Sequence, residues 1–323
     1  MSKYLSITAP SRIHITLISM TDELYRKNGG VGFAINGFDV CIDAYVSKKN
    51  SIDNSKNTNI DNRTIIATIN ILDNAVELYS LKKSIEVKIN KFPPQHSGFG
   101  SGTSFKLACL ESLFLVNKVK LEDSKLAFLS GRGGTSGIGI NTYFHGGFVF
   151  DLGRVVGPLL PSNTCKDFEL PLVLCKLFMP EWEIGIYKPS SIQSLSHEQE
   201  LSFFNKNCPI DKNSVVDLTH ELVFSLVPSI LEKNIINFSK SINTIQDSTW
   251  KKYEWDEYNN LFDVANSILH EDSYCFGLSS LGTACYFLAN DKSNIKRKMN
   301  VVDPNGLIRY VTVNNTGRIV TYV

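Results

Sequence analysis

The sequence has almost no net charge, because 33 lysines and arginines oppose 32 aspartates and glutamates and leave a formal charge of +1. Without a basic excess, there is no electrostatic reason to expect nucleic acid as the main partner. We expect no signal peptide at the start of this sequence and no membrane span, since no apolar run approaches the length of one. We therefore expect no membrane partner.

Paired cysteines are also missing. The seven cysteines are odd in number, scattered, and never in a C-x-x-C pair. Most sit in apolar surroundings, as reduced core cysteines do, which predicts a reducing compartment, the cytoplasm. The composition, 43% hydrophobic and 20% charged over 323 residues, is ordinary for a globular protein. A chain of this length forms one large domain or two smaller ones.

Glycine is concentrated in three places, and the first is the stretch Pro93–Val116. An alternating apolar run over residues 84–90 predicts a strand before it, and the almost wholly apolar second half predicts a buried helix. Gly98, Gly100 and Gly102 remove the side chains that would keep a ligand away from the backbone. Strand, glycine loop and helix N-terminus together predict an anion site, most naturally for phosphate. The alternative is a glycine turn that only lets the strand and the helix pack closely.

The second glycine cluster, Gly131–Ile140, contains Arg132, a good partner for a phosphate or a carboxylate. It follows a short helix expected at residues 124–129, and it precedes a strand expected at residues 146–151. We expect the two loops to form two walls of one pocket, with a flexible connector as the alternative for the second. The third cluster, Gly277–Gly282, is flanked by expected strands.

Several polar side chains are candidates for contact with a ligand. Arg12 and His14 lie two residues apart on a strand expected from Tyr4 to Met20, so they share a face. His96 precedes the first glycine loop and has either a catalytic or a plain structural role. Lys106 lies in the first helical turn, where its charge opposes the helix dipole, so it is either solvated or paired with a ligand phosphate.

The remaining pattern predicts an α+β protein. We expect a tight loop at residues 28–32, a strand at 40–46, a low-complexity surface loop at 48–62 and an amphipathic helix at 65–79. A domain junction is expected at residues 157–166. Beyond it we expect a strand at 182–187, a helix capping box at 196–199, and three helical faces, of which the first is ended or kinked at Pro228.

With these motifs together, the chain resembles the GHMP kinase superfamily, whose P-x-x-x-G-h-G-S motif matches Pro94 to Ser101. Within it, four segments are similar to the β-ribofuranosylaminobenzene 5′-phosphate synthase family: residues 10–14, 28–32, 96–103 and 131–140. Four later segments continue the similarity: residues 207–209, 218–220, 242–246 and 277–282.

The resemblance implies a two-domain GHMP fold, with a ribosomal-S5-like domain at residues 1–160 and a ferredoxin-like domain at 161–323. It implies a phosphoribosyltransferase that joins 4-aminobenzoate or 4-hydroxybenzoate to phosphoribosyl pyrophosphate and releases carbon dioxide and pyrophosphate, on the route to methanopterin. It also implies Mg²⁺, with ligands that the sequence does not reveal, and a homodimer.

On this reading, Arg12, His14 and Arg132 are the catalytic residues. Arg12 and His14 hold the aromatic acid, and Arg132 holds the sugar diphosphate. The residues expected to bind the diphosphate come from the two loops: His96, Ser97, Gly98, Gly100, Ser101, Gly102, Thr103, Gly133, Gly134 and Ser136.

Two alternatives remain, an ATP-dependent small-molecule kinase and a non-catalytic nucleotide- or phosphate-binding homologue. Kinases of the resembled superfamily carry a magnesium-binding serine at the position of Gly102 and a catalytic aspartate at the position of Gly139. Glycine can neither bind a metal through a side chain nor accept a proton from a hydroxyl. Phosphoryl transfer depends on both functions, so we expect no kinase activity.

Overall fold

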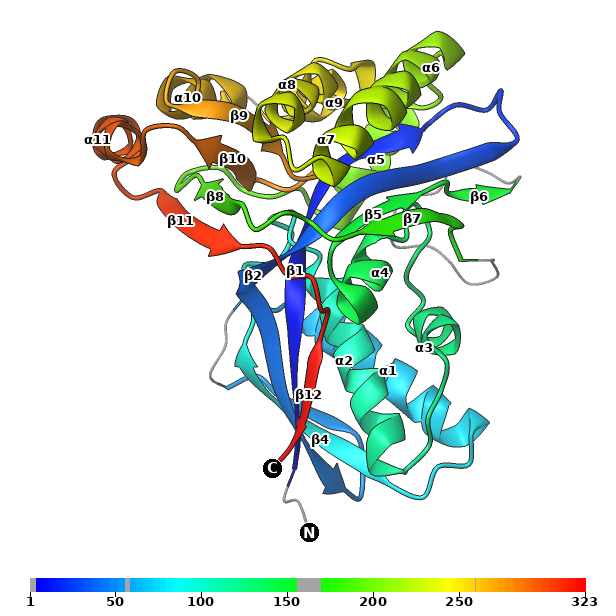
Figure 1. Cartoon of the computed structure of the whole chain (residues 1–323). Coiled ribbons are helices and arrows are strands. Elements are labelled where there is room, and N and C mark those ends of the chain that lie inside the picture. Colours follow the sequence, from blue (N-terminus) through cyan, green and yellow to red (C-terminus); the bar gives the residue numbers. More distant parts are fainter. Residues whose placement is uncertain (1–3, 56–58, 156–169, 259) are drawn as a thin grey trace.

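The structure is a computed structural model of the chain, and it describes residues 4–55, 59–155, 170–258 and 260–323 (Figure 1). The first half of the chain contains β1 (Leu5–Ser19), β2 (Arg26–Ser47), β3 (Ser51–Asp53), α1 (Asn62–Leu78), β4 (Ser84–Lys91), α2 (Ser101–Val116), α3 (Asp123–Leu129), α4 (Ile138–His145), β5 (Phe148–Asp151) and β6 (Arg154–Val155). The second half contains β7 (Val173–Leu177), β8 (Glu183–Lys188), α5 (His197–Asn207), α6 (Lys212–Glu221), the π-helical turn η1 (Leu222–Leu226), α7 (Val227–Leu231), α8 (Ile235–Gln246), α9 (Thr249–Asp256), α10 (Leu261–Leu269), β9 (Ser273–Leu278), β10 (Cys285–Ala289), α11 (Lys292–Val302), β11 (Leu307–Thr312) and β12 (Ile319–Tyr322).

Among the described residues, the strands form two sheets. The larger has eight strands in the order β12-β1-β2-β4-β3, with β5 and β6 paired to β2 and β7 paired to β5. The smaller has four antiparallel strands in the order β11-β8-β10-β9. The long strands β1 and β2 continue from the larger sheet into the region of the second-half helices (Figure 1). Side chains on β1 therefore lie between the two halves of the chain, where α6 and α9 contact that strand.

Helices α2 and α4 pack against the larger sheet, α1 packs on α2 and β3, and α3 packs on α2 (Figure 1). α1 starts at Asp61, whose carboxylate accepts a hydrogen bond from the backbone N–H of Thr64, and it buries Ile65, Leu72 and Ala75 against the sheet. α2 is buried on nearly all sides, as its unbroken apolar run predicts. The first turn of α2 is consequently held rigidly by the core beneath it.

Two segments that we interpreted as loops contain strands. Residues 28–32 lie inside β2, where Asn28 and Gly29 adopt φ angles of 65° and 85°. The sheet requires glycine here, because a Cβ on Gly30 would lie 2.9 Å from His14 Nε2 and one on Gly32 would lie 2.3 Å from the carbonyl oxygen of Ile13. The expected loop at residues 48–62 likewise contains β3, which pairs in parallel with β4.

Two helical expectations also need correction. The third helical face is split into α9 and α10, because Asn260 between them adopts a left-handed φ of 66°, which a continuous helix does not allow. In the second glycine cluster, α4 begins at Ile138, where we had expected the loop to continue. The capping box at Ser196 and Gln199 is confirmed.

Helix α6, the turn η1 and helix α7 form one helical stretch of 20 residues, Lys212–Leu231. Pro228 is the second residue of α7, which follows the π-helical turn, so it distorts the stretch and does not end it. The stretch is long and apolar enough to cross a membrane by length and composition, with a mean hydropathy of 1.4, so our expectation about apolar runs is wrong for this segment. Core helices of soluble proteins pass the same test, and 33% of the window is buried.

The domain junction expected at residues 157–166 lies outside the described residues, and the division at residue 160 stays a prediction. Two strands from beyond that point belong to the larger sheet. β7 pairs with β5, and β12 pairs with β1 in the register Leu5 to Tyr322.

Candidate active site

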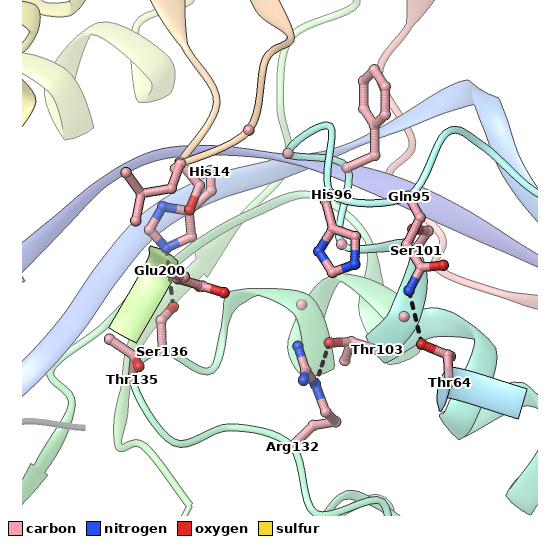
Figure 2. A pocket seen from close by; sticks show the side chains of 18 of the residues that line it. His14, Thr64, Gln95, His96, Ser101, Thr103, Arg132, Thr135, Ser136 and Glu200 are labelled. Atoms are coloured by element: carbon pink, nitrogen blue, oxygen red, sulfur yellow. Dashed lines mark hydrogen bonds between the residues drawn. The ribbon is translucent and has the colours of Figure 1, made fainter. Parts of the chain in front are cut away.

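A cavity of about 700 Å³ lies between the glycine loops of the first half and helices α5 and α9 of the second. All three glycine clusters contribute to its wall, including Gly98–Thr103, Arg132–Gly133 and Ser280–Gly282. The expectation that the first two loops form two walls of one pocket is therefore confirmed. Figure 2 shows His14, Ser136 and Glu200 gathered at one end of the cavity, with Gln95 and Thr64 at the other.

Four helices begin at this cavity, and they differ in how their first turns are capped. The side chain of Asp61 caps α1, and that of Ser196 caps α5. α2 and α4 start from Gly100 and Gly137, which have no side chain that could cap them, although the N–H of Ile138 at the start of α4 donates to Ser136 Oγ. Uncapped N–H groups and the positive end of the helix dipole attract anions. The two helices that follow the glycine loops thus provide the anion-binding starts.

Arg12 lies on β1 beneath the first glycine loop. Its Nη1 donates to the carbonyl oxygen of Gly98, and a Cβ on Gly100 would lie 3.1 Å from its Cγ. Its Nε is buried and has no hydrogen-bond partner in the described part of the chain. Burial, followed by the positive charge of Arg132, lowers the pKa of Arg12 to about 10. Because the two positive charges repel each other, an anionic ligand that binds near both is favoured.

Arg132 connects the second glycine loop to the first helix start. Its Nε donates to the hydroxyl oxygen of Thr103 at 2.9 Å (Figure 2). Lys106, one turn further along α2, lines the same wall, and burial, followed by the charge of Arg132, lowers its pKa to about 8. Of our two interpretations of Lys106, this position favours pairing with a ligand phosphate.

His14 lies at the end of the cavity opposite Gln95 and Thr64, and it is only 3% exposed. Its backbone N–H donates to Ser279 Oγ at 3.1 Å, which connects β1 to the third glycine loop. Its Nε2 lies 3.3 Å from Ser136 Oγ. Burial, then the charges of Arg12 and Lys251, hold the pKa of His14 well below its usual range, so its ring is neutral.

Asp151, at the end of β5, supports Ser136 from behind. The Ser136 hydroxyl donates to Asp151 Oδ2 at 3.1 Å, and the N–H of Gly137 donates to the same oxygen at 2.9 Å. The N–H of Gly153 donates to Oδ1 at 2.9 Å. Burial raises the pKa of Asp151 to about 7 although these bonds favour the ionised form. Asp151 thus holds the loop before α4 in place.

The α1 end of the cavity carries amide, hydroxyl and imidazole groups. Gln95 Nε2 donates to Asp61 Oδ2 and to Thr64 Oγ1, both at 2.8 Å. His96 Nε2 lies 3.6 Å from Asp61 Oδ2. These contacts hold Gln95 and His96 at the cavity wall, where both can meet a ligand (Figure 2).

The sequence did not single out the acidic residues of the wall. Glu200 of α5 and Glu254 of α9 both line the cavity. Glu254 is 1% exposed and accepts hydrogen bonds from Lys251 Nζ and from Trp250 Nε1. Lys251, fully buried, also donates to the carbonyl oxygen of Leu278 at 2.7 Å. The i,i+3 spacing of Lys251 and Glu254 was visible in the sequence, but an exposed pair has the same spacing.

Most residues that we predicted to bind ligand line the cavity: Arg12, His14, His96, Gly98, Gly100, Ser101, Gly102, Thr103, Arg132, Gly133 and Ser136. Ser97 and Gly134, which the structure also describes, are outside this lining. Ser97 is 2% exposed, and its carbonyl oxygen accepts from the N–H of Ala284, so its place is behind the loop. The chemical roles of the lining residues stay predictions.

Gly102 and Gly139 line the cavity where the resembled kinases carry serine and aspartate. A Cβ on Gly102 would meet nothing within 4 Å, and one on Gly139 would meet Thr103 Cγ2 at 3.4 Å, an ordinary contact. Neither packing nor a left-handed backbone requires glycine at these positions. What the two glycines provide is space in the cavity and close access to the backbone.

Three curated archaeal proteins, each named β-ribofuranosylphenol 5′-phosphate synthase, are similar over most of this chain. The one from Methanothermobacter thermautotrophicus is 30% identical over 89% of each chain. The one from Methanocaldococcus jannaschii is 28% identical over 96% of this chain and 98% of its own. The one from Archaeoglobus fulgidus is 29% identical over 90% of this chain and 89% of its own. No family model matches the chain.

Solved structures of GHMP kinases share the fold. Homoserine kinase from Cytophaga hutchinsonii superposes with a TM-score of 0.69 at 16% identity, over 99% of this chain and 98% of its own. Phosphomevalonate kinase from Streptococcus pneumoniae gives a TM-score of 0.68 at 12% identity, over 96% and 100%. Mevalonate kinase from Methanococcus jannaschii gives 0.64 at 14% identity, over 96% and 98%. The expected GHMP fold, of class α+β, is confirmed.

Proposed function

Since the chain belongs to the β-ribofuranosylphenol 5′-phosphate synthase family, we propose that it is a decarboxylating phosphoribosyltransferase. It joins an aromatic acid to phosphoribosyl pyrophosphate and releases carbon dioxide and pyrophosphate, as in methanopterin biosynthesis. The relatives are named for a ribosylated phenol, which favours 4-hydroxybenzoate over 4-aminobenzoate as the acid. Loss of carbon dioxide from a ribosylated 4-hydroxybenzoate leaves a phenol.

One observation supports this function above the others: the starts of α2 and α4 and the side chains of Arg12 and Arg132 meet in one cavity. The diphosphate would lie against the first turns of α2 and α4, with Arg132 and Lys106 beside it. Breaking the bond between ribose C1 and the diphosphate leaves positive charge on the sugar and negative charge on the leaving group. Preorganised N–H groups and cations stabilise that leaving group as its charge develops.

The aromatic acid would occupy the end of the cavity near β1. Arg12 Nε, buried and without a partner in the described residues, can donate to a carboxylate oxygen, while Nη1 remains fixed by Gly98. Arg12 and His14 would orient the acid so that the ring carbon bearing the carboxylate faces ribose C1. A carbon–carbon bond forms there as the diphosphate leaves. The bond to the carboxylate then breaks, and carbon dioxide departs as the ring regains aromaticity.

The residues fit a magnesium ion that arrives with the diphosphate. No cluster of three His, Cys, Asp or Glu side chains among the described residues could hold a metal by itself. Mg²⁺ commonly binds through one or two carboxylates together with substrate phosphates, and Glu200 places one carboxylate on the wall. When bound, the ion would neutralise diphosphate charge.

Kinase activity is the second candidate, because the structural neighbours named above are kinases. Gly102 and Gly139 argue against it, since a Cβ would be accommodated at both positions and yet neither residue carries a side chain. A non-catalytic phosphate-binding homologue would not need buried polar groups such as Arg12 and His14 at the far end of the cavity.

The deciding experiment supplies purified protein with magnesium, phosphoribosyl pyrophosphate and carboxyl-labelled 4-hydroxybenzoate or 4-aminobenzoate. We expect labelled carbon dioxide and pyrophosphate in equal amounts. ATP consumption with a small alcohol, and no carbon dioxide, would replace this function by a kinase. Cytoplasmic location and a homodimer stay predictions, and sedimentation of the purified protein would test the second.

A further inference from the structure

Asp151, Ser136 and His14 form a continuous chain of hydrogen bonds that ends in an unpartnered nitrogen. Ser136 Oγ lies 3.1 Å from Asp151 Oδ2. It also lies 3.3 Å from His14 Nε2 (Figure 2). Asp151 is 0% exposed and His14 is 3% exposed. His14 Nδ1 is buried and has no partner among the described residues. Buried polar atoms are rarely left unpaired, so Nδ1 on this cavity-lining ring is suited to a ligand group.

The positions of the hydrogen atoms in this series of hydrogen bonds follow from counting donors and acceptors. A serine hydroxyl has one proton and two lone pairs. The N–H of Ile138, 3.2 Å from Ser136 Oγ, can only donate to it. An ionised Asp151 can only accept, so the hydroxyl proton points to the carboxylate. The remaining lone pair of Ser136 then accepts from His14, whose ring proton must be on Nε2.

Protonation of Asp151 reverses the chain. The carboxylic acid donates to Ser136 Oγ, the hydroxyl proton turns to His14 Nε2, and the ring proton must move to Nδ1. We propose that Asp151 is a positioning residue that acts through Ser136 to set which nitrogen of His14 carries the proton, and that the ionised carboxylate keeps Nδ1 as an acceptor for a hydroxyl of the bound aromatic acid. The second clause rests on the proposed function, whereas the first does not.

The charges around these hydrogen bonds permit both the ionised and the protonated form of Asp151. Burial brings the pKa of Asp151 to about 7, and the pKa of His14 is held well below its usual range by burial and nearby cations, so the ring is neutral and must choose a tautomer. The other charged side chains facing the two ends are Arg26 of β2, Arg12 of β1, Lys251 and Glu254 of α9, and Glu200 of α5.

Nitrogen NMR of histidine-labelled protein without ligand tests the first clause, because the two tautomers give different signals. The His14 signals are assigned by their loss in His14→Gln. We expect the Nε2–H form above pH 7, near the pKa of Asp151, and the Nδ1–H form below it. Ser136→Ala should remove this dependence on pH. Asp151→Asn cannot ionise, so it should show one tautomer at every pH.

The wild-type titration decides the matter even if Asp151→Asn fails to fold. An Nδ1–H tautomer above pH 7, or a tautomer that does not change across the pKa of Asp151, overturns the proposal. The same result in wild type and Ser136→Ala also overturns it, since the serine would then transmit nothing.

Binding of two acids tests the second clause. Wild-type protein should bind 4-hydroxybenzoate about tenfold more tightly than 4-methoxybenzoate, which has no proton to donate. Asp151→Asn should lose this preference if its spectrum shows the Nδ1–H form and keep it if the spectrum shows the Nε2–H form. Equal affinities in the wild type overturn the second clause. If neither acid binds, the proposed function fails, and the NMR result still decides the role of Asp151.

Discussion

The guanidinium Nε of Arg132 lies 2.9 Å from the hydroxyl oxygen of Thr103, and this contact joins the second glycine loop to the first turn of α2. The helices α2 and α3 separate the two loops in sequence, yet one hydrogen bond holds their ligand-facing groups together. The relative placement of the two anion-binding helix starts therefore depends on a side chain as well as on the backbone.

Arg132→Ala is expected to weaken binding of phosphoribosyl pyrophosphate by roughly 1.5–3 kcal/mol, the value of one charge-assisted contact. Affinity for the aromatic acid should stay nearly unaltered. Arg12→Ala should do the reverse, and Arg12→Lys should restore little if the contact to the carboxylate needs the planar guanidinium. Calorimetry of each variant with each ligand measures the difference. If both alanine variants weaken the same ligand equally, the cavity is not divided in this way.

Gly102→Ala should stabilise the protein and impair the site. Alanine in place of a helical glycine adds about 0.5–1 kcal/mol to the free energy of unfolding, and nothing lies within 4 Å of the new Cβ. The methyl group should nevertheless occupy space that the diphosphate needs. Denaturant unfolding and pyrophosphate binding give the two measurements, and unchanged binding would show that Gly102 is not at the ligand.

Gly98→Ala is the matched control for the first loop. Gly98 has a φ of +91°, and a Cβ there would lie 2.2 Å from the carbonyl oxygen of Ser279. We expect this variant to lose stability as well as binding.

Gly100→Val, at a φ of +72° and against the side chain of Arg12, should abolish the thermal stabilisation by phosphoribosyl pyrophosphate while the fold is retained.

Lys106 should make diphosphate binding depend on pH. The pKa of Lys106 is about 8 in the folded protein and 10.5 in the unfolded chain, so between these values the unfolded chain holds more protons and stability without ligand rises with pH. A bound diphosphate raises the pKa again, so binding above pH 8 takes up a proton and weakens as the pH rises. Calorimetry in buffers of different ionisation enthalpy detects the proton. Lys106→Met should bind more weakly, without proton uptake from this residue.

The buried pair of Lys251 and Glu254 should be sensitive to the loss of one partner. The two side chains are 0% and 1% exposed. Lys251→Met leaves a buried carboxylate without its cation and should cost about 3–5 kcal/mol of unfolding free energy. The double variant Lys251→Met/Glu254→Gln should recover most of this loss. Equal stability of the single and double variants, measured by denaturant unfolding, would show that the charge is compensated elsewhere.

Local pattern was sufficient for the parts of the site that are built by short segments. The alternation at residues 84–90, the three glycines and the apolar helix are contiguous, and together they placed the first glycine loop correctly. The amphipathic spacing of apolar residues also predicted the α1 helix. In these segments, neighbours in sequence are also the groups that determine the structure.

Long-range contacts explain what the sequence did not reveal. Gly30 and Gly32 resemble a turn locally, but they are glycines because β1 passes directly against them. The sequence does not predict the contacts of Asp151 with Ser136 and Gly137, since these residues belong to a loop that the fold brings beside it. Nothing in the sequence indicated that Lys251 and Glu254 are buried, because spacing along a helix does not show which face packs against the rest of the protein.

The pairing of β12 with β1, in which Leu5 lies opposite Tyr322, bears on the timing of folding during synthesis. Residues of β1 carry Arg12 and His14 into the cavity, but the edge of their sheet is completed by β12, which leaves the ribosome long after β1. Such pairing across almost the whole chain closes a very large loop and is intrinsically slow. Until it forms, the edge of β1 has unpaired N–H and C=O groups that could pair with another nascent chain, so this edge is where misassembly would begin.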